Sequence, residues 1–92
     1  MRINFYATLR EIVGGKTVEL PLQDGMTIQS LLDTLFERYP RLRQELVDEQ
    51  GNLYPHVHVF VNGRDAPFLE AGLQTPISEQ DVISIFPAVG GG

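Results

Sequence analysis

The last ten residues of the chain, 83–92, read Ile-Ser-Ile-Phe-Pro-Ala-Val-Gly-Gly-Gly. Two isoleucines alternate with Ser84 and Phe86, which predicts a strand with one buried face. Pro87 has no N–H to give to a sheet ladder, so strand pairing should stop there. The five residues that follow could extend about 17 Å at 3.3 Å each. The sequence therefore predicts a strand that continues directly into a glycine tail.

The glycine tail does not help the fold. Glycine loses more conformational entropy on ordering than any other residue, so Gly90–Gly92 cannot stabilise a terminus. A backbone without β-carbons is narrow, and it could deliver a terminal carboxylate into the cleft of another protein. The alternative is an inert end with no role. The sequence of the rest of the chain is needed to choose between a reactive tail and an inert end.

The N-terminal third predicts a hairpin. Apolar residues alternate with polar ones from Arg2 to Ala7, which indicates a strand with Ala7 on its buried face. Gly14-Gly15 is a turn signal, and a second strand is predicted over 16–22.

A helix follows over residues 28–39. Its apolar residues recur at helical spacing and form one continuous stripe, which should cover one face of a sheet. Thr27 is suited to cap its first turn, and Pro40 should end it. Leu42 and Leu46 are one helical step apart and indicate a short second helix.

The C-terminal half predicts three further strands. Alternating valines over 57–61 indicate a strand, the dipeptide Asn62-Gly63 a tight turn, and 64–66 a short edge strand. The connection to the last strand, 81–86, should pack against the core through Phe68, Leu69 and Leu73. This order predicts an α+β, β-grasp (ubiquitin-like) fold: a mixed sheet with one main helix packed across it, the first and last strands central, and a flexible C-terminal Gly-Gly tail.

Length and composition exclude several classes of protein. Ninety-two residues make one small domain, which we assign to 1–87, with 88–92 as the tail. There is no cysteine, so the chain has neither a thiol nucleophile nor a disulfide. A net charge of −5 argues against nucleic acid. No apolar run approaches a membrane span, and we expect a cytoplasmic protein. Lys16 is the single lysine.

Two side-chain groups are candidate sites. His56 and His58 are two residues apart on the predicted strand and could hold a metal, but no carboxylate or cysteine converges on them in the sequence, so we expect surface histidines and no metal. Phe60, Phe86 and Tyr6 should lie on the face of the sheet that the helix leaves uncovered. Such an aromatic cluster is typical of a docking patch.

Three stretches, together with the terminal Gly91-Gly92, resemble the MoaD/ThiS family of ubiquitin-like sulfur carriers. These are residues 5–11 (Phe-Tyr-Ala-Thr-Leu-Arg-Glu), 61–65 (Val-Asn-Gly-Arg-Asp) and 81–89 (Asp-Val-Ile-Ser-Ile-Phe-Pro-Ala-Val). The similarity spans nearly the whole chain. It is strongest to small subunits of molybdopterin synthase and nearly as strong to a carrier used in a cysteine-making pathway.

The resemblance implies a function for the tail. In such proteins an enzyme similar to ubiquitin-activating enzymes uses ATP to adenylate the terminal carboxylate, here that of Gly92, and a sulfur donor then leaves a thiocarboxylate. No side chain of the carrier acts as a catalyst, and no cofactor is permanently bound. Gly90 and Gly91 would thread the partner's cleft. Together with Val89, Pro87, Phe86 and Phe60 they are the predicted partner-binding residues.

Several functions remain open from the sequence. The first is a sulfur carrier for molybdenum cofactor synthesis, which would bind an activating enzyme and the large subunit of molybdopterin synthase in turn. The alternatives are a carrier for cysteine or another sulfur metabolite, a modifier that Gly92 joins to protein lysines, and an interaction module with an inert tail. We expect neither a nucleic-acid nor a membrane partner.

Overall fold

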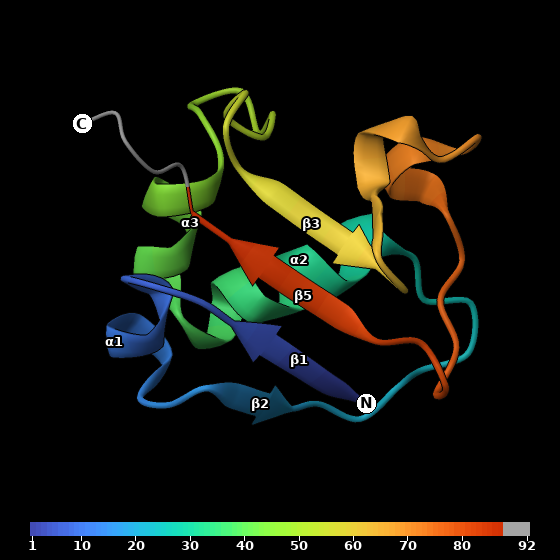
Figure 1. The fold of residues 1–92 in the computed structure, drawn as a ribbon, viewed down its shortest axis with the longest axis horizontal. Helices are drawn as coiled ribbons and strands as arrows, with labels where there is room; N and C mark the ends of the chain where they lie inside the picture. The colour runs from blue at the N-terminus through green and yellow to red at the C-terminus, as the bar shows by residue number, and fades with distance from the viewer. Residues whose placement is uncertain (88–92) are drawn as a thin grey trace.

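The computed structural model describes residues 1–87, which fold around a five-stranded mixed sheet (Figure 1). The strands are β1 (Arg2–Phe5), β2 (Thr17–Glu19), β3 (His58–Val61), β4 (Arg64–Asp65) and β5 (Ile83–Phe86). Their order across the sheet is β2-β1-β5-β3-β4. β1 and β5 pair in parallel, whereas the other neighbours are antiparallel. The prediction that the first and last strands are neighbours is confirmed.

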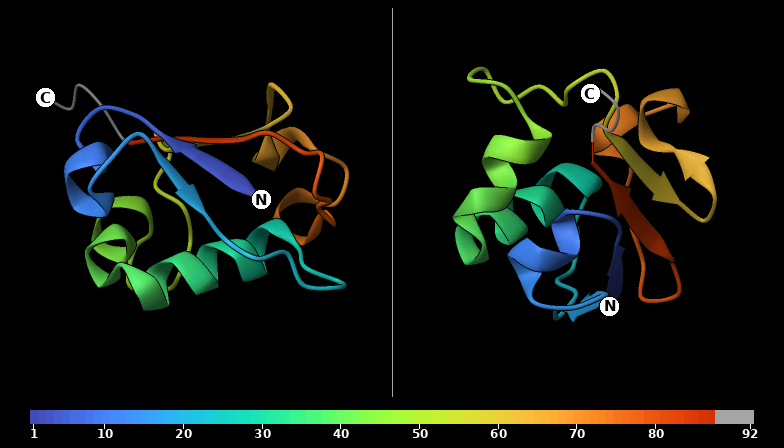
Figure 2. Two further views of the ribbon diagram at one scale, coloured as in Figure 1. Left: turned by 90° about the horizontal axis from the view of Figure 1, so that it is seen from below. Right: turned by 60° about the vertical axis from the view of Figure 1, so that its left-hand side comes forward.

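Helices cover one face of this sheet (Figure 2). The main helix is α2 (Ile28–Arg38), and α1 (Leu9–Val13) and α3 (Pro40–Leu46) lie together near its C-terminal end (Figure 2). Two 3-10 turns, η1 (Ala66–Phe68) and η2 (Gly72–Gln74), lie between β4 and β5 in the sequence. Within residues 1–87, no helix lies over the other face of the sheet (Figure 2). We call it the open face.

The ends of α2 follow from its sequence. The Ser30 amide donates to Thr27 Oγ1 (3.2 Å) and the Thr27 amide donates to Ser30 Oγ (2.7 Å), so each residue caps the other. Pro40 ends α2 as predicted, because the residue before a proline avoids helical geometry. Tyr39 accordingly lies at φ −131° and ψ 82°, and Pro40 then begins α3.

The core lies between the sheet and α2. Inward-facing strand residues and the apolar stripe of α2 are buried together, and Leu42 and Leu46 anchor α3 as predicted. Fully buried large side chains are Ile3, Phe5, Leu9, Ile28, Leu31, Leu32, Leu35, Leu42, Leu46, Val59, Ile83 and Ile85. This arrangement confirms the β-grasp, ubiquitin-like fold.

All five strands are shorter than predicted; β3 begins one residue later, at His58, and β4 ends one residue earlier, at Asp65. β1 ends at Phe5, and Ala7 is exposed with φ 54° because the chain turns there into α1, a helix that the sequence did not indicate. β2 is shorter than 16–22, since Pro21 cannot donate to a ladder. β5 begins at Ile83 rather than at residue 81.

The connection between β4 and β5 also differs in part. Leu69 and Leu73 pack against the core as predicted. Phe68 does not, because its residue surface is 86% exposed at the end of η1. The prediction that Phe68 is buried is therefore wrong.

Candidate docking surface at the end of the central strand

The candidate site begins where the chain leaves the centre of the sheet. β5 lies between β1 and β3, with Ile85 opposite both Phe5 and Val59. Phe86 is the last residue of β5 and pairs with His58, and the next residue, Pro87, is buried. The polypeptide thus leaves from a central strand. The predicted site residues Val89, Gly90, Gly91 and Gly92 lie outside the described residues.

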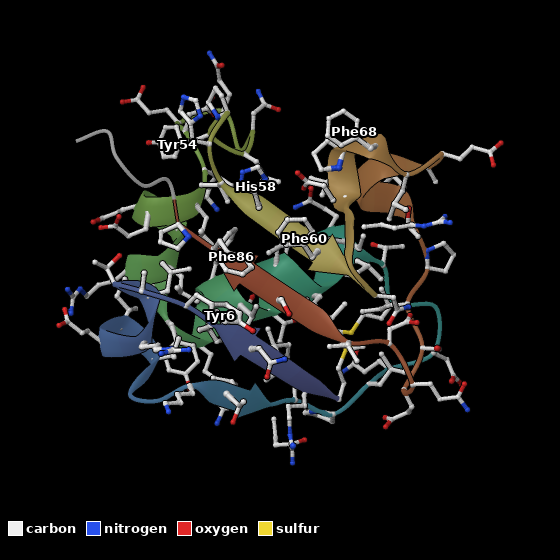
Figure 3. The ribbon with its side chains drawn as sticks, in the orientation of Figure 1. Tyr6, Tyr54, His58, Phe60, Phe68 and Phe86 are labelled. Atoms are coloured by element: carbon white, nitrogen blue, oxygen red, sulfur yellow. The ribbon has the colours of Figure 1, made fainter. Side chains whose placement is uncertain are left out.

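Four rings form a continuous line across the open face (Figure 3). Tyr6 and Phe86 stack with centroids 4.1 Å apart and planes 9° apart, and Phe60 meets Phe86 edge-on at 5.5 Å. His58 stacks on Phe60 at 5.6 Å. We call Tyr6, Phe86, Phe60 and His58 the aromatic run. Each is half-buried, so the rings shield one another and still present surface to a partner.

Arg10 holds one end of the aromatic run. Its Nε donates to the carbonyl oxygen of Phe5 at 2.8 Å, and its guanidinium lies 5.2 Å from the centroid of the Tyr6 ring. The left-handed conformation of Ala7 makes the turn that brings α1, and with it Arg10, back against the end of β1. The guanidinium therefore fixes the Tyr6 ring next to Phe86 by a cation–π contact and a backbone hydrogen bond.

Asp65 holds the other end. The Nδ1–H of His58 donates to Asp65 Oδ2 at 2.7 Å, with the side chains 46% and 15% exposed. Oδ1 of Asp65 is buried and has no hydrogen-bond partner within residues 1–87. A carboxylate that accepts from Nδ1 leaves Nε2 of His58 as the ring nitrogen available to a partner.

Within residues 1–87, this arrangement offers half-buried aromatic surface of the kind that binds another protein. Over the same residues there is no cluster of three His, Cys, Asp or Glu side chains that could hold a metal. His56 lies in the turn before β3, so the prediction that it shares a strand face with His58 is wrong. The sequence interpretation also missed the carboxylate of Asp65 beside His58.

A protein-family model described as the ThiS family matches residues 3–92. The chain belongs to the ThiS family. The motifs of residues 5–11, 61–65 and 81–89, on which the resemblance rested, lie inside the matched range.

Curated relatives of this ThiS-family chain carry two kinds of name. Small archaeal modifier protein 3 of Haloferax volcanii is 37% identical over 92 residues, which cover 100% of this chain and 98% of that protein. Sulfur carrier protein CysO of Mycobacterium bovis is 34% identical over 70 residues, 74% of each chain. The chain is thus a ubiquitin-like protein of the sulfur carrier and modifier class.

A solved structure agrees with the fold of the ThiS-family chain. A chain in the crystal structure of the Amycolatopsis orientalis BexX/CysO complex superposes with a TM-score of 0.79 at 32% identity. The match covers 99% of this chain and 98% of that one. Within residues 1–87 of the ThiS-family chain, none of the helices has the length and apolar character needed to span a bilayer.

One signal in the sequence could have located Asp65. A two-residue Asn62-Gly63 loop pairs the residues on either side of it, which puts Asp65 opposite Phe60. His58 is two residues along from Phe60, and such diagonal neighbours across two strands are within reach of long side chains. Hairpin register therefore predicts the His58–Asp65 contact in this ThiS-family chain. Arg10 left no comparable signal, because its contacts depend on the turn at Ala7.

Proposed function

We propose that this chain is a sulfur carrier whose C-terminal Gly92 carboxylate is adenylated and then converted to a thiocarboxylate. One observation carries the proposal: the last described residue, Pro87, continues from a central strand whose final side chain, Phe86, lies in the middle of an exposed aromatic run. A partner that docks on the aromatic run is therefore positioned beside the root of the tail. The 34% identity to a sulfur carrier protein supports the same function.

The chemistry needs an activating enzyme and ATP. A carboxylate is a poor electrophile, and conversion to a mixed anhydride with AMP divides one difficult step into two easier ones. A sulfur donor then attacks the acyl carbon, the bond to AMP breaks, and the thiocarboxylate remains on Gly92. In this proposal Val89, Gly90 and Gly91 pass through the enzyme's cleft, where a bulkier side chain at the glycines would clash.

In this proposal the residues of the folded domain bind the partner enzyme and orient it relative to the tail. Phe60 and Phe86 provide apolar contact area, while Arg10 and Asp65 keep the end rings in place. One similar chain was crystallised in a complex with another protein, which supports docking as the task of this fold. We propose an adenylating enzyme and then a sulfur-accepting enzyme as the partners.

The large subunit of molybdopterin synthase is the sulfur acceptor that the sequence favoured, and it stays a prediction. An acceptor in a cysteine-making pathway is the alternative that the sequence left open, and the match to a sulfur carrier protein supports either acceptor. Both acceptors would receive the same thiocarboxylate. The test is to offer the thiocarboxylated protein to each acceptor enzyme separately and to measure which one consumes it.

A second function is supported by the match to a modifier protein along the full length of this chain. In that function a lysine amine of a target attacks the same activated glycine, and an isopeptide bond forms. An adduct that survives boiling in denaturant and reductant would support it. Carrier and modifier functions share the adenylation step and differ only in the nucleophile.

The experiment follows the intact mass of the protein after incubation with ATP, the adenylating enzyme and a sulfide donor. We expect a species heavier by the difference between one sulfur and one oxygen atom, confined to the C-terminal fragment. Deletion of Gly92 should abolish it and leave the thermal midpoint unchanged, because a terminal glycine has no side chain to bury and loses more conformational entropy on ordering than any other residue. Failure to release AMP, or an equal loss of folding stability in the deletion variant, would overturn the proposal.

A further inference from the structure

Lys16, the single lysine of the chain, lies at a hydrogen-bonded turn between α1 and β2. Gly14 ends α1 at φ 83°, and the amides of Gly14 and Gly15 both donate to the carbonyl oxygen of Arg10, at 2.9 and 3.0 Å. The carbonyl oxygen of Lys16 then accepts from the Phe5 amide at 2.8 Å. These bonds fix the backbone from which the lysine side chain extends.

The surroundings of this turn are open. Lys16 is exposed, and a β-carbon added at Gly14 or Gly15 would meet no heavy atom within 4 Å. The ion pairs found among residues 1–87 do not include the Lys16 amine. The ε-amine is therefore sterically accessible and not held by a carboxylate of the described fold.

Lys16 also lies at the end of the sheet where β5 finishes. Phe5 is hydrogen-bonded to Lys16 on one side and is in register with Ile85 on the other. Because β1 and β5 are parallel, both finish at the end of the sheet where the turn after α1 lies, with β1 between β5 and that turn (Figure 1). Lys16 is two strand spacings from Ile85, about 10 Å.

We propose that the ε-amine of Lys16 accepts the activated Gly92 carboxylate of a second copy of this chain, so that copies are joined by a Lys16–Gly92 isopeptide bond. The inference rests on the proposed activation of Gly92. The uncharged amine attacks the acyl carbon of the adenylate, a C–N bond forms, and AMP leaves with the electron pair of the broken C–O bond. The nitrogen gives up its proton to solvent. ATP and the adenylating enzyme are the only co-reactants.

A second copy fits better than the same molecule. The six residues from Pro87 to Gly92 can extend about 20 Å, and the activating enzyme must hold them extended in its cleft. Lys16 of the same molecule lies about 10 Å from Ile85, so the tail would have to leave that cleft and fold back to reach it. Each copy has one lysine ε-amine and one donor glycine, so conjugation through lysine would give unbranched chains with a single type of linkage.

The test separates donor from acceptor with two full-length variants. The donor is untagged Lys16→Arg, which keeps Gly92 and has no lysine. The acceptor keeps Lys16 and carries a lysine-free affinity tag after Gly92, which removes its free glycine carboxylate. With ATP and the adenylating enzyme, we expect a covalent dimer retained on the tag. Cleavage after glutamates should give residues 12–19 with residues 80–92 attached at Lys16.

The matched control is a tagged acceptor that also carries Lys16→Arg, which should form no dimer. A dimer with this control would overturn the assignment to Lys16. A wild-type product lighter than the monomer by one water would show ring closure within one molecule and would overturn the second copy. Pyrophosphate release without any dimer would refute the inference and leave the proposed function standing, whereas no pyrophosphate release from the donor would refute the proposed function itself.

Discussion

Ile85 and Phe86 are neighbours on strand β5 and lie on opposite faces of the sheet. Ile85 faces α2 and has no exposed surface, because the whole core packs around it. Phe86 faces away from the helices and is half-buried, chiefly by Tyr6 and Phe60 (Figure 3). One residue is covered by the fold, and the other is covered only by its neighbours on the open face.

Along β5, the residues that face the core therefore contribute mainly to folding stability, and the residues on the open face are available for partner docking. Apolar side chains on the core face contribute about 1.5–3 kcal/mol each through area removed from water, whatever their direction of contact. Rings on the open face bury less area in the free protein and can bury more against a partner. Alternate residues of β5 can therefore be changed to disturb one property with little effect on the other.

The largest effect is expected on the core face. Ile85→Ala should lower the free energy of unfolding by about 2–5 kcal/mol, because it removes three carbons from a fully buried site and leaves a cavity. Ser84→Ala, one residue earlier on the open face, should change it by less than about 0.5 kcal/mol. Urea unfolding followed by circular dichroism measures both. Equal losses in the two variants would contradict the division between the faces.

A smaller effect is expected on partner binding. Phe86→Ala removes the ring at the centre of the aromatic run, and we expect a loss of about 2 kcal/mol in docking, or about 30-fold in kcat/KM for adenylation. Phe68→Ala is the matched control, since it removes an exposed aromatic ring that lies outside the run. Initial rates of pyrophosphate release at varied carrier concentration, below the thermal midpoint of every variant, measure both.

The outcome of that pair tests where the partner docks. An unchanged rate for Phe86→Ala would remove the aromatic run from the interface. A rate that falls with Phe68→Ala alone would move the interface to the η1 turn and away from the root of the tail.

The core face could be predicted from the sequence because its signals are periodic. Alternation in β1, β3 and β5 and the helical stripe of α2 identified the buried positions within these elements, and Thr27 and Pro40 marked the ends of α2. Buried residues outside these elements, such as Leu9, Met26 and Ile77, were not identified. Ala7 and Phe68 were expected to be buried and are exposed. Ala7 continues the alternation of β1 but has left-handed geometry that strand periodicity does not encode. Phe68 is an apolar residue in the connection between β4 and β5, where no strand or helix periodicity shows whether a side chain points to the core or to solvent.

The open face was predicted only in part. Tyr6, Phe60 and Phe86 were expected to lie near one another, because outward positions on neighbouring strands share a face, and their contacts confirm this. The two groups that hold the ends, Arg10 and Asp65, were not expected. The contacts of Arg10 depend on the turn at Ala7, and those of Asp65 depend on the register of the β3–β4 hairpin. Neither feature is encoded in the periodicity of apolar residues. The reactive role of the tail was inferred only from the terminal glycines and the family resemblance, and it stays a proposal.

The smallest predicted effect concerns the His58–Asp65 pair, where the order of the losses is informative. His58→Ala should destabilise the fold more than Asp65→Ala, because it leaves a carboxylate that is 15% exposed without its hydrogen-bond donor. Asp65→Ala removes that carboxylate, including the Oδ1 that has no partner within residues 1–87, and lets the His58 ring turn to water. The double variant should resemble Asp65→Ala, with a coupling of about 1 kcal/mol between the two sites. Urea unfolding of the four proteins measures this cycle. A larger loss for Asp65→Ala would mean that the carboxylate stabilises something besides His58, and that this end of the aromatic run belongs to the fold rather than to the docking surface.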